Sequence, residues 1–506
     1  DLKGIRVPRP TYGLRSSEDR TRVAMLTLVV SLVVLGQSGV TQWAASTFFS
    51  AGGPGRPWAE IGGTRLYPPW AWLSWISHVP DHRLHEFRSL VLLSVAGPLL
   101  LAAWIVRAQR LSTQHGSARW ANKRELVRAG LLSSVKRGGV YVGAWRNPLG
   151  SVQYLRHDGS EHVLAFAPTR SGKGIGLVIP TLLSWRESAV VLDIKGENWE
   201  RTAGWRVGHA GQRVIRFDPT DPESARYNPL AAIRLETPHE IADAQNIATM
   251  LVDPQGRGVE RDHWAQTAWS LLVGAILHVC YRERRRGGLG TLSQVAEELT
   301  SSESGDLSEI MEGWLCFPHR GGEDGCERSR GATPTHPVVA ATAREMQQRT
   351  PKEASSVLSS ALAVLTLYRD PVIARATGGS DFRVEDLVDH PQPTPVYLVI
   401  PPRDLTRVRP LVRLMVDQIV RGLTLDLPSE APRPDDSGLK RRLGSFGSRN
   451  QPLPEEGRRR VLLMLDEFAS LGKMENLEHS LAHCAGYGVK AYLVVQDLAQ
   501  LFSAYG

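Results

Sequence analysis

The sequence predicts an α/β protein with a parallel-rich central sheet, an inserted all-α domain and an N-terminal anchor of two transmembrane helices. Three observations indicate this fold class. Apolar strands alternate with helical segments before residue 233 and after residue 380, the residues between them show helical periodicity, and two long uncharged runs lie near the N-terminus. Strand, helix and strand in this order form a βαβ unit, whose strands are parallel. With 506 residues, the chain is too long for one core and should hold two or three domains.

Composition limits the membrane part and says little about partners. Hydrophobic residues make up 42% of the chain, an ordinary value for a soluble protein, so any membrane part must be small. The formal charge of +8 suggests an acidic partner, but the flanks of the two uncharged runs supply part of it. Charge alone is therefore weak evidence for nucleic acid.

The two uncharged runs are candidate membrane spans. Each approaches the ~20 apolar residues that cross a bilayer, so we expect spans at about residues 23–45 and 89–107, with a short, Trp-rich periplasmic loop at 50–87. Buried core helices are the alternative, but core helices of this length normally carry a polar stripe. The basic flanks are Lys3, Arg6, Arg9, Arg15, Arg20 and Arg22 before the first span, and Arg107, Arg110, Arg119, Lys123 and Arg124 after the second. Because cytoplasmic flanks are enriched in Lys and Arg, both ends of the chain are expected in the cytoplasm.

The segment 161–184, EHVLAFAPTRSGKGIGLVIPTLLS, passes from an apolar strand through a Gly-rich turn into a helix. This order is typical of a phosphate-binding loop, in which backbone N–H groups and the helix N-terminus face an anion. Lys173 could then reach the β- and γ-phosphates of a nucleotide. The nucleotide-binding residues predicted here are Ala167, Pro168, Thr169, Arg170, Ser171, Gly172, Lys173, Gly174 and Ile175.

The loop departs from the usual pattern at both ends. It opens with Ala167 instead of Gly, and Gly174 follows the lysine where Ser or Thr normally ligates Mg²⁺. Ser171 or Thr169 would have to help bind the metal, or leave water there. An ordinary Gly-rich turn between a strand and a helix is the alternative.

Two strand ends carry acids that could complete the site. Residues 461–467, VLLMLDE, form an apolar strand that ends in Asp466 and Glu467, and ligands of open α/β sheets bind at this carboxyl edge. We expect Asp466 to hold Mg²⁺ and Glu467 to polarise the attacking water. Asp193 also ends a strand, but no second acid follows it, so we prefer the later pair. A strand-end Asp that caps the next turn is the alternative for both.

Gln496 follows the next apolar strand, residues 491–495. Its amide could orient water or sense the γ-phosphate, as glutamines do in other nucleotide hydrolases. A strand-end amide without function is the alternative.

The remaining segments indicate how the chain is divided into domains and offer no further catalytic residues. The basic run at residues 282–286 ends one helix and is expected to be a solvated face and not a DNA contact. A Pro-, Gly- and charge-rich segment at 428–460 is expected to be a mobile loop. We expect four parts: the membrane anchor at 1–110, the first half of a nucleotide-binding domain at 111–232, the all-helical domain at 233–380 and the second half at 381–506.

Taken together, several segments resemble the type IV secretion coupling proteins, most closely their TraG-like branch. The similar segments are the two spans, HGSARWANK from 115, YLRHDGSEHVLAFAPTRSGKGIGLVIPTLLSW from 154, DIKGENWERTAGWR from 193, LYRDPVIAR from 367, VLLMLDEFASLGKMENL from 461 and AGYGVKAYLVVQDLAQL from 485. In that branch the form Ala-Pro-Thr-Arg-Ser-Gly-Lys-Gly is usual, which accounts for Ala167 and Gly174.

The resemblance implies a RecA-like motor domain with an inserted helical domain, ATP and Mg²⁺ as cofactors, and a homo-hexamer in the bacterial inner membrane. Such motors recruit DNA, expected here to be single-stranded, with a bound relaxase, or recruit protein effectors, and pass them to other components of the secretion system. ATP would lie between subunits, with an arginine supplied in trans that the sequence does not identify. The family continues beyond this point of the sequence, so a fragment is expected.

Two other functions stay open at this point. One is a nucleotide-binding docking platform for secretion substrates with little hydrolysis, and the other is a DNA translocase of the chromosome-partitioning type. Whether the cargo is DNA, protein or both is also open.

Overall fold

The computed structural model divides into two compact units, Asp1–Ala121 and Asn122–Gly506. Within them the structure describes residues 17–49, 55–109, 120–132, 139–147, 150–253, 259, 262–301, 307–320, 335–424 and 459–505. The predicted mobile loop, except for its last residues, and most of the motif that begins at residue 115 lie outside the described residues.

The first unit is built on two long helices, α1 (Ser17–Phe48) and α3 (Leu84–Gln109), which pack against each other. By length and composition, Leu26–Phe48 and Asp81–Trp104 could cross a membrane, so the two predicted apolar helices are present. Between them the chain forms an antiparallel hairpin of β1 (Ala59–Ile61) and β2 (Thr64–Leu66), followed by the short helix α2 (Trp72–Trp75). Two single turns, Ile76–His78 and Asp81–Arg83, lead into α3.

An aromatic cluster holds the connecting segment against the two helices. Trp75 and Tyr67 are buried together with Phe87 of α3 and Ala44 of α1. The rings of Tyr67 and Trp75 meet edge to face, with centroids 4.9 Å apart, an arrangement that aromatic pairs favour. The connecting segment is therefore a packed cap and not an open loop.

The second unit contains a parallel sheet of six strands in the order β5-β10-β9-β6-β8-β7. The strands are β5 (Val163–Phe166), β6 (Ser188–Asp193), β7 (Ile215–Phe217), β8 (Val396–Val399), β9 (Val461–Leu465) and β10 (Val489–Val495). Every residue of β6, β8, β9 and β10 is buried, as expected for parallel strands covered on both faces. The predicted α/β fold class is confirmed.

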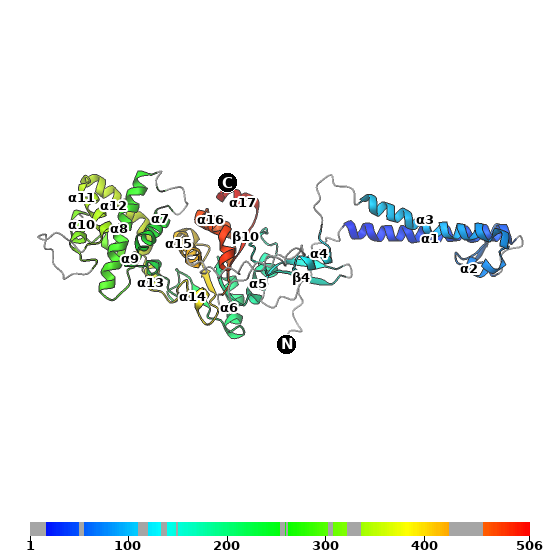
Figure 1. Cartoon of the computed structure of the whole chain (residues 1–506), viewed down its shortest axis with the longest axis horizontal. Coiled ribbons are helices and arrows are strands. Elements are labelled where there is room, and N and C mark those ends of the chain that lie inside the picture. The colour runs from blue at the N-terminus through cyan, green and yellow to red at the C-terminus, as the bar shows by residue number, and fades with distance from the viewer. Residues whose placement is uncertain are drawn as a thin grey trace, which may run out of the picture. The chain divides into compact units, whose positions relative to one another are not determined.

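Helices cover both faces of this sheet (Figure 1). On one face the alternate strand residues pack against α5 (Ile179–Ser184) and α6 (Glu197–Gly208). On the other they pack against α15 (Leu405–Thr424) and α16 (Glu475–Cys484). The last helix, α17 (Leu498–Tyr505), follows β10, and the hairpin of β3 (Val140–Arg146) and β4 (Val152–His157) precedes β5.

Helices are the only regular secondary structure among the described residues between β7 and β8. They are α7 (Glu240–Val252), α8 (His263–Arg285), α9 (Leu292–Glu298), α10 (Leu307–Cys316), α11 (Pro337–Gln348), α12 (Pro351–Leu365), α13 (Pro371–Ala376) and α14 (Asp386–Asp389). The helix α8 is buried along most of its length, and its core is continuous with that of α15 and the sheet. The helical insertion thus exists, and the boundaries at 232 and 380 stay predictions.

Candidate functional site

The Gly-rich turn after β5 exposes its backbone at the carboxyl edge of the sheet. Arg170 and Gly172 both adopt left-handed conformations, with φ of 62° and 84°, so the chain reverses sharply between Pro168 and Lys173. A Cβ atom added at Gly172, Gly174 or Gly176 would meet no atom within 4 Å. Successive N–H groups beside open space are what an anion-binding turn requires.

The predicted helix begins directly after this turn. Its first turn, Gly174–Val178, is a wide π-helical turn, and α5 continues it to Ser184. Gly176 N donates to Gly172 O at 2.8 Å, which joins the turn to the helix. Ile175 is exposed at the mouth of the turn, where a nucleotide could contact its backbone.

Lys173 lies between the two predicted acids. Its Nζ is 2.8 Å from Glu467 Oε1 and 3.3 Å from Asp466 Oδ1. Burial alone would lower the pKa of Lys173, but the hydrogen bond to Glu467 and the charge of Asp466 raise it above the usual value. Both Lys173 and Glu467 are therefore charged at neutral pH.

Gln496 forms hydrogen bonds with both Glu467 and the Gly-rich turn after β5. Its Nε2 donates to Glu467 Oε2 at 2.8 Å, and its Oε1 accepts from Thr169 Oγ1 at 3.2 Å. Burial raises the pKa of Glu467, but its hydrogen bonds with Lys173 and Gln496 lower it below the usual value. The residues predicted after β5, β9 and β10 thus meet at one edge of the sheet.

Asp193 and Asp466, the two candidate ligands of Mg²⁺, differ in the contacts that their carboxylate oxygens make. Asp193 and Asp466 end adjacent strands, and Asp193 Oδ2 accepts from the backbone N–H of Trp199 at 2.8 Å. Asp193 therefore caps the turn before α6, which was its alternative role. Asp466 Oδ1 is buried and, beyond its ion pair with Lys173, accepts no hydrogen bond. This oxygen suits a metal ligand, and the contrast favours Asp466.

The magnesium site predicted at Asp466 and Ser171 is sparse in protein ligands. No cluster of three or more His, Cys, Asp or Glu residues that could hold a metal occurs in the described part of the chain. Mg²⁺ at nucleotide sites is commonly held by one or two protein groups and substrate phosphates. Ser171 is exposed on the turn, so the donor set fits this mode of binding.

Arg413 is a residue of this site that sequence reasoning missed. It is buried on α15 and donates to the carbonyl oxygens of Leu471 and Lys473, in the segment just after Glu467. Its signal in the sequence is weak: a basic residue at a position of α15 that otherwise reads as apolar. Only the packing of α15 against this segment reveals the contact.

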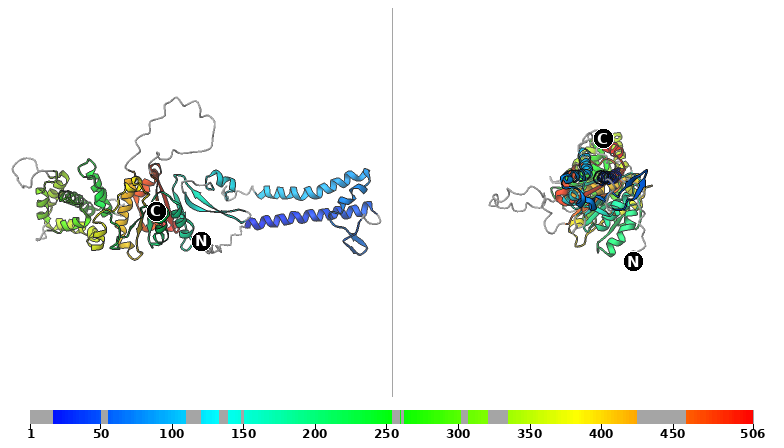
Figure 2. Two further views of the ribbon diagram at one scale, coloured as in Figure 1. Left: turned by 90° about the horizontal axis from the view of Figure 1, so that it is seen from below. Right: turned by 90° about the vertical axis from the view of Figure 1, so that its right-hand side faces the viewer.

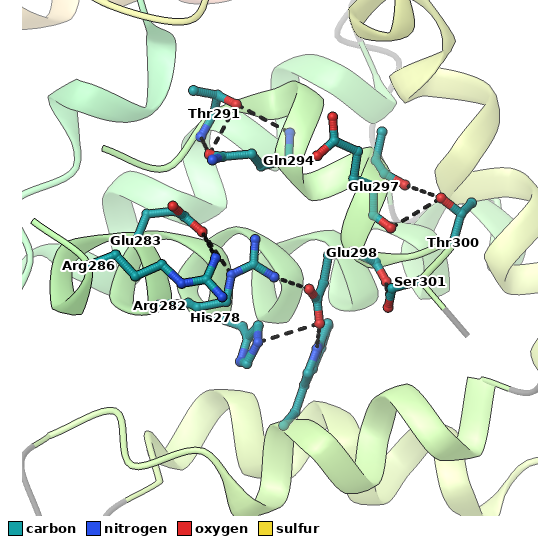
Figure 3. Close-up of polar contacts among 12 residues, drawn as sticks. His278, Arg282, Glu283, Arg286, Thr291, Gln294, Glu297, Glu298, Thr300 and Ser301 are labelled. Carbon is teal, nitrogen blue, oxygen red and sulfur yellow. Dashed lines mark hydrogen bonds and ion pairs between the residues drawn. The ribbon is translucent and has the colours of Figure 1, made fainter. Parts of the chain in front are cut away.

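The basic run at the end of α8 is engaged within the protein. Arg282 is 2.9 Å from Glu283 and also pairs with Glu298, and Arg286 is 3.0 Å from Glu283 (Figure 3). Arg284 pairs in the same way with Glu236 at 2.7 Å. Three of the four arginines of the run thus pair with carboxylates, whereas Arg285 donates to the carbonyl oxygen of Pro318.

Comparison with known proteins gives consistent matches along the chain. The family described as type IV secretory system conjugative DNA transfer matches residues 111–439 and 442–506. The chain is 40% identical over 492 residues to a conjugal transfer protein TraG of Escherichia coli, a match that covers 92% of this chain and 71% of that protein. It is 30% identical over 428 residues to a protein VirD4 of Rhizobium rhizogenes, covering 83% of this chain and 55% of that one.

Solved structures of the plasmid coupling protein TrwB are also similar. One, in complex with the ATP analogue ADPNP, has a TM-score of 0.48 and 20% identity, covering 77% of this chain and 74% of that one. Another, in complex with ADP and Mg²⁺, has a TM-score of 0.44 and 18% identity, covering 76% and 73%.

Proposed function

Because the chain belongs to the type IV secretory system conjugative DNA transfer family, we propose that it couples ATP hydrolysis to the delivery of substrates into the secretion channel. The chain is accordingly a coupling protein of conjugative DNA transfer. Its hydrolysis of ATP, its use of magnesium and the identity of its substrates are the parts that we propose.

One observation carries the proposal. Glu467 contacts both Lys173 and Gln496 where the neighbouring strands β5, β9 and β10 end. A phosphate-binding cation, with a carboxylate or an amide that can position the attacking water, is a combination that nucleotide hydrolases use. A structural turn would not require all three.

The roles follow from these contacts. The backbone N–H groups of residues 167–175 and the ammonium of Lys173 would bind the phosphates. A phosphate that binds Lys173 competes with Glu467 for the ammonium, which frees this carboxylate. Once Glu467 has lost the Lys173 contact that lowers its pKa, it is a stronger base and can accept a proton from the attacking water, which Gln496 can orient.

Asp466 and Ser171 would hold Mg²⁺. The buried Asp466 Oδ1, which accepts no hydrogen bond, fits this group. When bound, Mg²⁺ supplies positive charge beside the phosphates. Asp466 also keeps Lys173 at the edge of the sheet through their ion pair.

The membrane placement rests on α1, α3 and their basic flanks. Two spans with cytoplasmic flanks rich in Lys and Arg support a two-pass protein of the bacterial inner membrane with both ends in the cytoplasm. The second unit would then face cytoplasmic ATP.

The partners are proposed from family membership. We infer single-stranded DNA with its relaxase, or protein effectors, as cargo, together with other components of the secretion system. A homo-hexamer with nucleotide between subunits is part of the same proposal.

Steady-state ATP hydrolysis by the full chain in lipid nanodiscs, with and without single-stranded DNA, tests the proposal. We expect turnover that DNA stimulates and that Lys173→Ala abolishes. Glu467→Gln should leave ATP binding intact and lower turnover by ~10²- to 10⁴-fold, the usual contribution of a general base. Lys352→Ala, at an exposed position of α12, is the matched control and should behave as wild type.

Other outcomes would replace the proposal. Undiminished hydrolysis by Glu467→Gln would reject this residue as the base. ATP binding without turnover under any condition would favour the docking platform, and stimulation by double-stranded DNA alone would favour a translocase of the chromosome-partitioning type.

A further inference from the structure

The segment between the two candidate spans folds back onto α1. Trp72 Nε1 donates to Gln37 Oε1 at 2.5 Å, and Gln37 Nε2 donates to Ser94 Oγ of α3 at 2.6 Å. Thr41 Oγ1 donates to Pro69 O at 2.9 Å. Accordingly, α2 lies beside the end of the α1 and α3 pair and not beyond it (Figures 1 and 2).

The depth of these contacts in the bilayer follows from the rise per residue of the two helices. Arg22 is the last charged residue before the first span, and Arg107 is the first after the second. Gln37 is 15 residues after Arg22 and Ser94 is 13 residues before Arg107, which at about 1.5 Å per residue puts both about 20 Å from the cytoplasmic boundary. Since the hydrocarbon core is about 30 Å thick, the Trp72–Gln37–Ser94 contact lies inside the outer leaflet.

Polar side chains of α1 form hydrogen bonds with backbone carbonyls of the connecting segment, which reaches this depth. Irregular backbone is tolerated at membrane depth only where protein satisfies its polar groups. Thr41 bonds the carbonyl of Pro69, and Gln42 Nε2 donates to Tyr67 O at 3.3 Å. The segment thus turns polar backbone toward α1.

Large apolar side chains cover the outside of the same segment. Trp58 is 64% exposed, Trp70 58% and Leu73 60%. The two indole rings meet edge to face, with centroids 5.0 Å apart, and Leu73 N donates to Trp70 O within one turn at 3.1 Å. These three residues, here called the aromatic face, form an apolar surface that water would solvate poorly, because burying each side chain is favourable by ~1.5–3 kcal/mol.

We propose that the aromatic face lies in the outer leaflet of the bilayer and contacts lipid at the membrane–water interface. The inference rests on the membrane anchor of the proposed function. Indole side chains combine an apolar ring with an N–H donor and concentrate at this depth. The ion pair of Glu60 and Arg65, 3.4 Å apart and exposed on the hairpin, stays among head groups or water because charges avoid hydrocarbon.

Spin labels on the full chain in nanodiscs of phosphatidylethanolamine and phosphatidylglycerol test this placement. Labels at Trp70→Cys and Leu73→Cys are compared with a label at Glu60→Cys, all at exposed positions where substitution spares the core. The background is the full chain with Ala at its native cysteines, Cys280, Cys316, Cys326 and Cys484. Collision with lipid-soluble oxygen relative to a water-soluble nickel chelate should be several-fold higher for Trp70→Cys and Leu73→Cys than for Glu60→Cys.

A fourth label separates this inference from the anchor itself. Leu100, exposed on α3 inside its candidate span, should report lipid when mutated to Cys and labelled. If Leu100→Cys reports lipid but Trp70→Cys and Leu73→Cys report water, the inference is overturned and the aromatic face is open to a protein partner. If Leu100→Cys also reports water, the anchor fails and this inference fails with it.

Discussion

Glu467 has an unusual backbone conformation for a glutamate. Its φ and ψ are 64° and 40°, a left-handed conformation that costs a non-glycine residue ~1–3 kcal/mol and persists only where its surroundings enforce it. The turn Phe468–Leu471 begins immediately after it, and Arg413 donates to carbonyls at and beyond the end of that turn. We infer that Arg413 is a positioning residue, which fixes the backbone that carries Glu467.

Replacing Arg413 should lower turnover without weakening nucleotide binding. We expect Arg413→Met to reduce kcat about tenfold, equivalent to ~1.4 kcal/mol, because Glu467 loses its fixed position while the phosphate-binding turn is untouched. Arg413→Lys, which keeps one donor, should recover part of the loss. The measurement is kcat beside the Kd for ATP.

A second buried arginine provides the matched control. Arg206 on α6 also donates to two carbonyls, of Leu182 and Glu187, away from the acidic strand end. An equal loss of kcat in Arg206→Met, or a raised Kd in Arg413→Met, would show a general loss of structure and not a positioning effect.

At the scale of single elements, a buried lysine fixes the start of β10, the strand next to the edge strand β5. Lys490 Nζ donates to Gly159 O at 2.7 Å, Glu161 O at 2.8 Å and His157 Nδ1 at 2.8 Å. Burial, aided by the charge of Arg460, lowers the pKa of Lys490 to about 8, although Glu161 and Asp158 oppose this. The turn between β4 and β5 is thereby tied to the amino edge of the sheet.

This pKa predicts a rise in stability with pH. Between pH 8 and 10.5 the unfolded chain keeps a proton on Lys490 that the folded chain has lost, so the free energy of unfolding increases as pH rises through this window. A shift of this size corresponds to ~3 kcal/mol at 1.36 kcal/mol per unit. Unfolding of the full chain by urea, measured across this window, should show a rise in wild type relative to Lys490→Met, because the raised pKa values of Cys280 and Cys484 affect both proteins alike.

The exposed Lys352 supplies the comparison for this experiment. Lys352→Met should keep the wild-type dependence on pH, because this side chain lies on the surface of α12. The same dependence of stability on pH in wild type and in Lys490→Met would contradict the account of Lys490.

The strands that form the site could be predicted because their signals are local. Residues 189–192 and 461–465 are uninterrupted apolar runs, and the structure has strands that contain them. Since the ends of parallel strands share one edge, Asp466, Glu467 and Gln496 could be expected near the turn that carries Lys173.

What could not be predicted depends on long-range packing. Chain order does not reveal that β10 lies between β5 and β9, so the bond of Gln496 to Glu467 was not foreseeable. The contact of Arg413 requires α15 to pack beside the segment after Glu467. Likewise, the sequence predicted a short outer loop at 50–87 but not the hydrogen bonds with Gln37, Thr41 and Gln42 that hold it against α1.

At the scale of the whole molecule, net charge is a poor guide to where cargo binds. The chain carries +8, yet three of the four arginines of the α8 run pair with carboxylates. Other basic residues flank the two apolar helices, where we propose that they set the orientation of the anchor. Whether free positive charge follows a DNA path must therefore be measured on the assembled protein.

The salt dependence of single-stranded DNA binding makes that measurement. A protein that neutralises phosphates releases counterions, so contact with about four phosphates of a single strand predicts a ~50-fold loss of affinity between about 50 and about 200 mM salt. The control is Arg284→Gln, which should leave the slope unchanged because Glu236 already pairs with this guanidinium. A shallower salt dependence of DNA affinity in Arg284→Gln would indicate that the α8 run contacts DNA. Affinity independent of salt would exclude a basic channel and favour protein as the cargo.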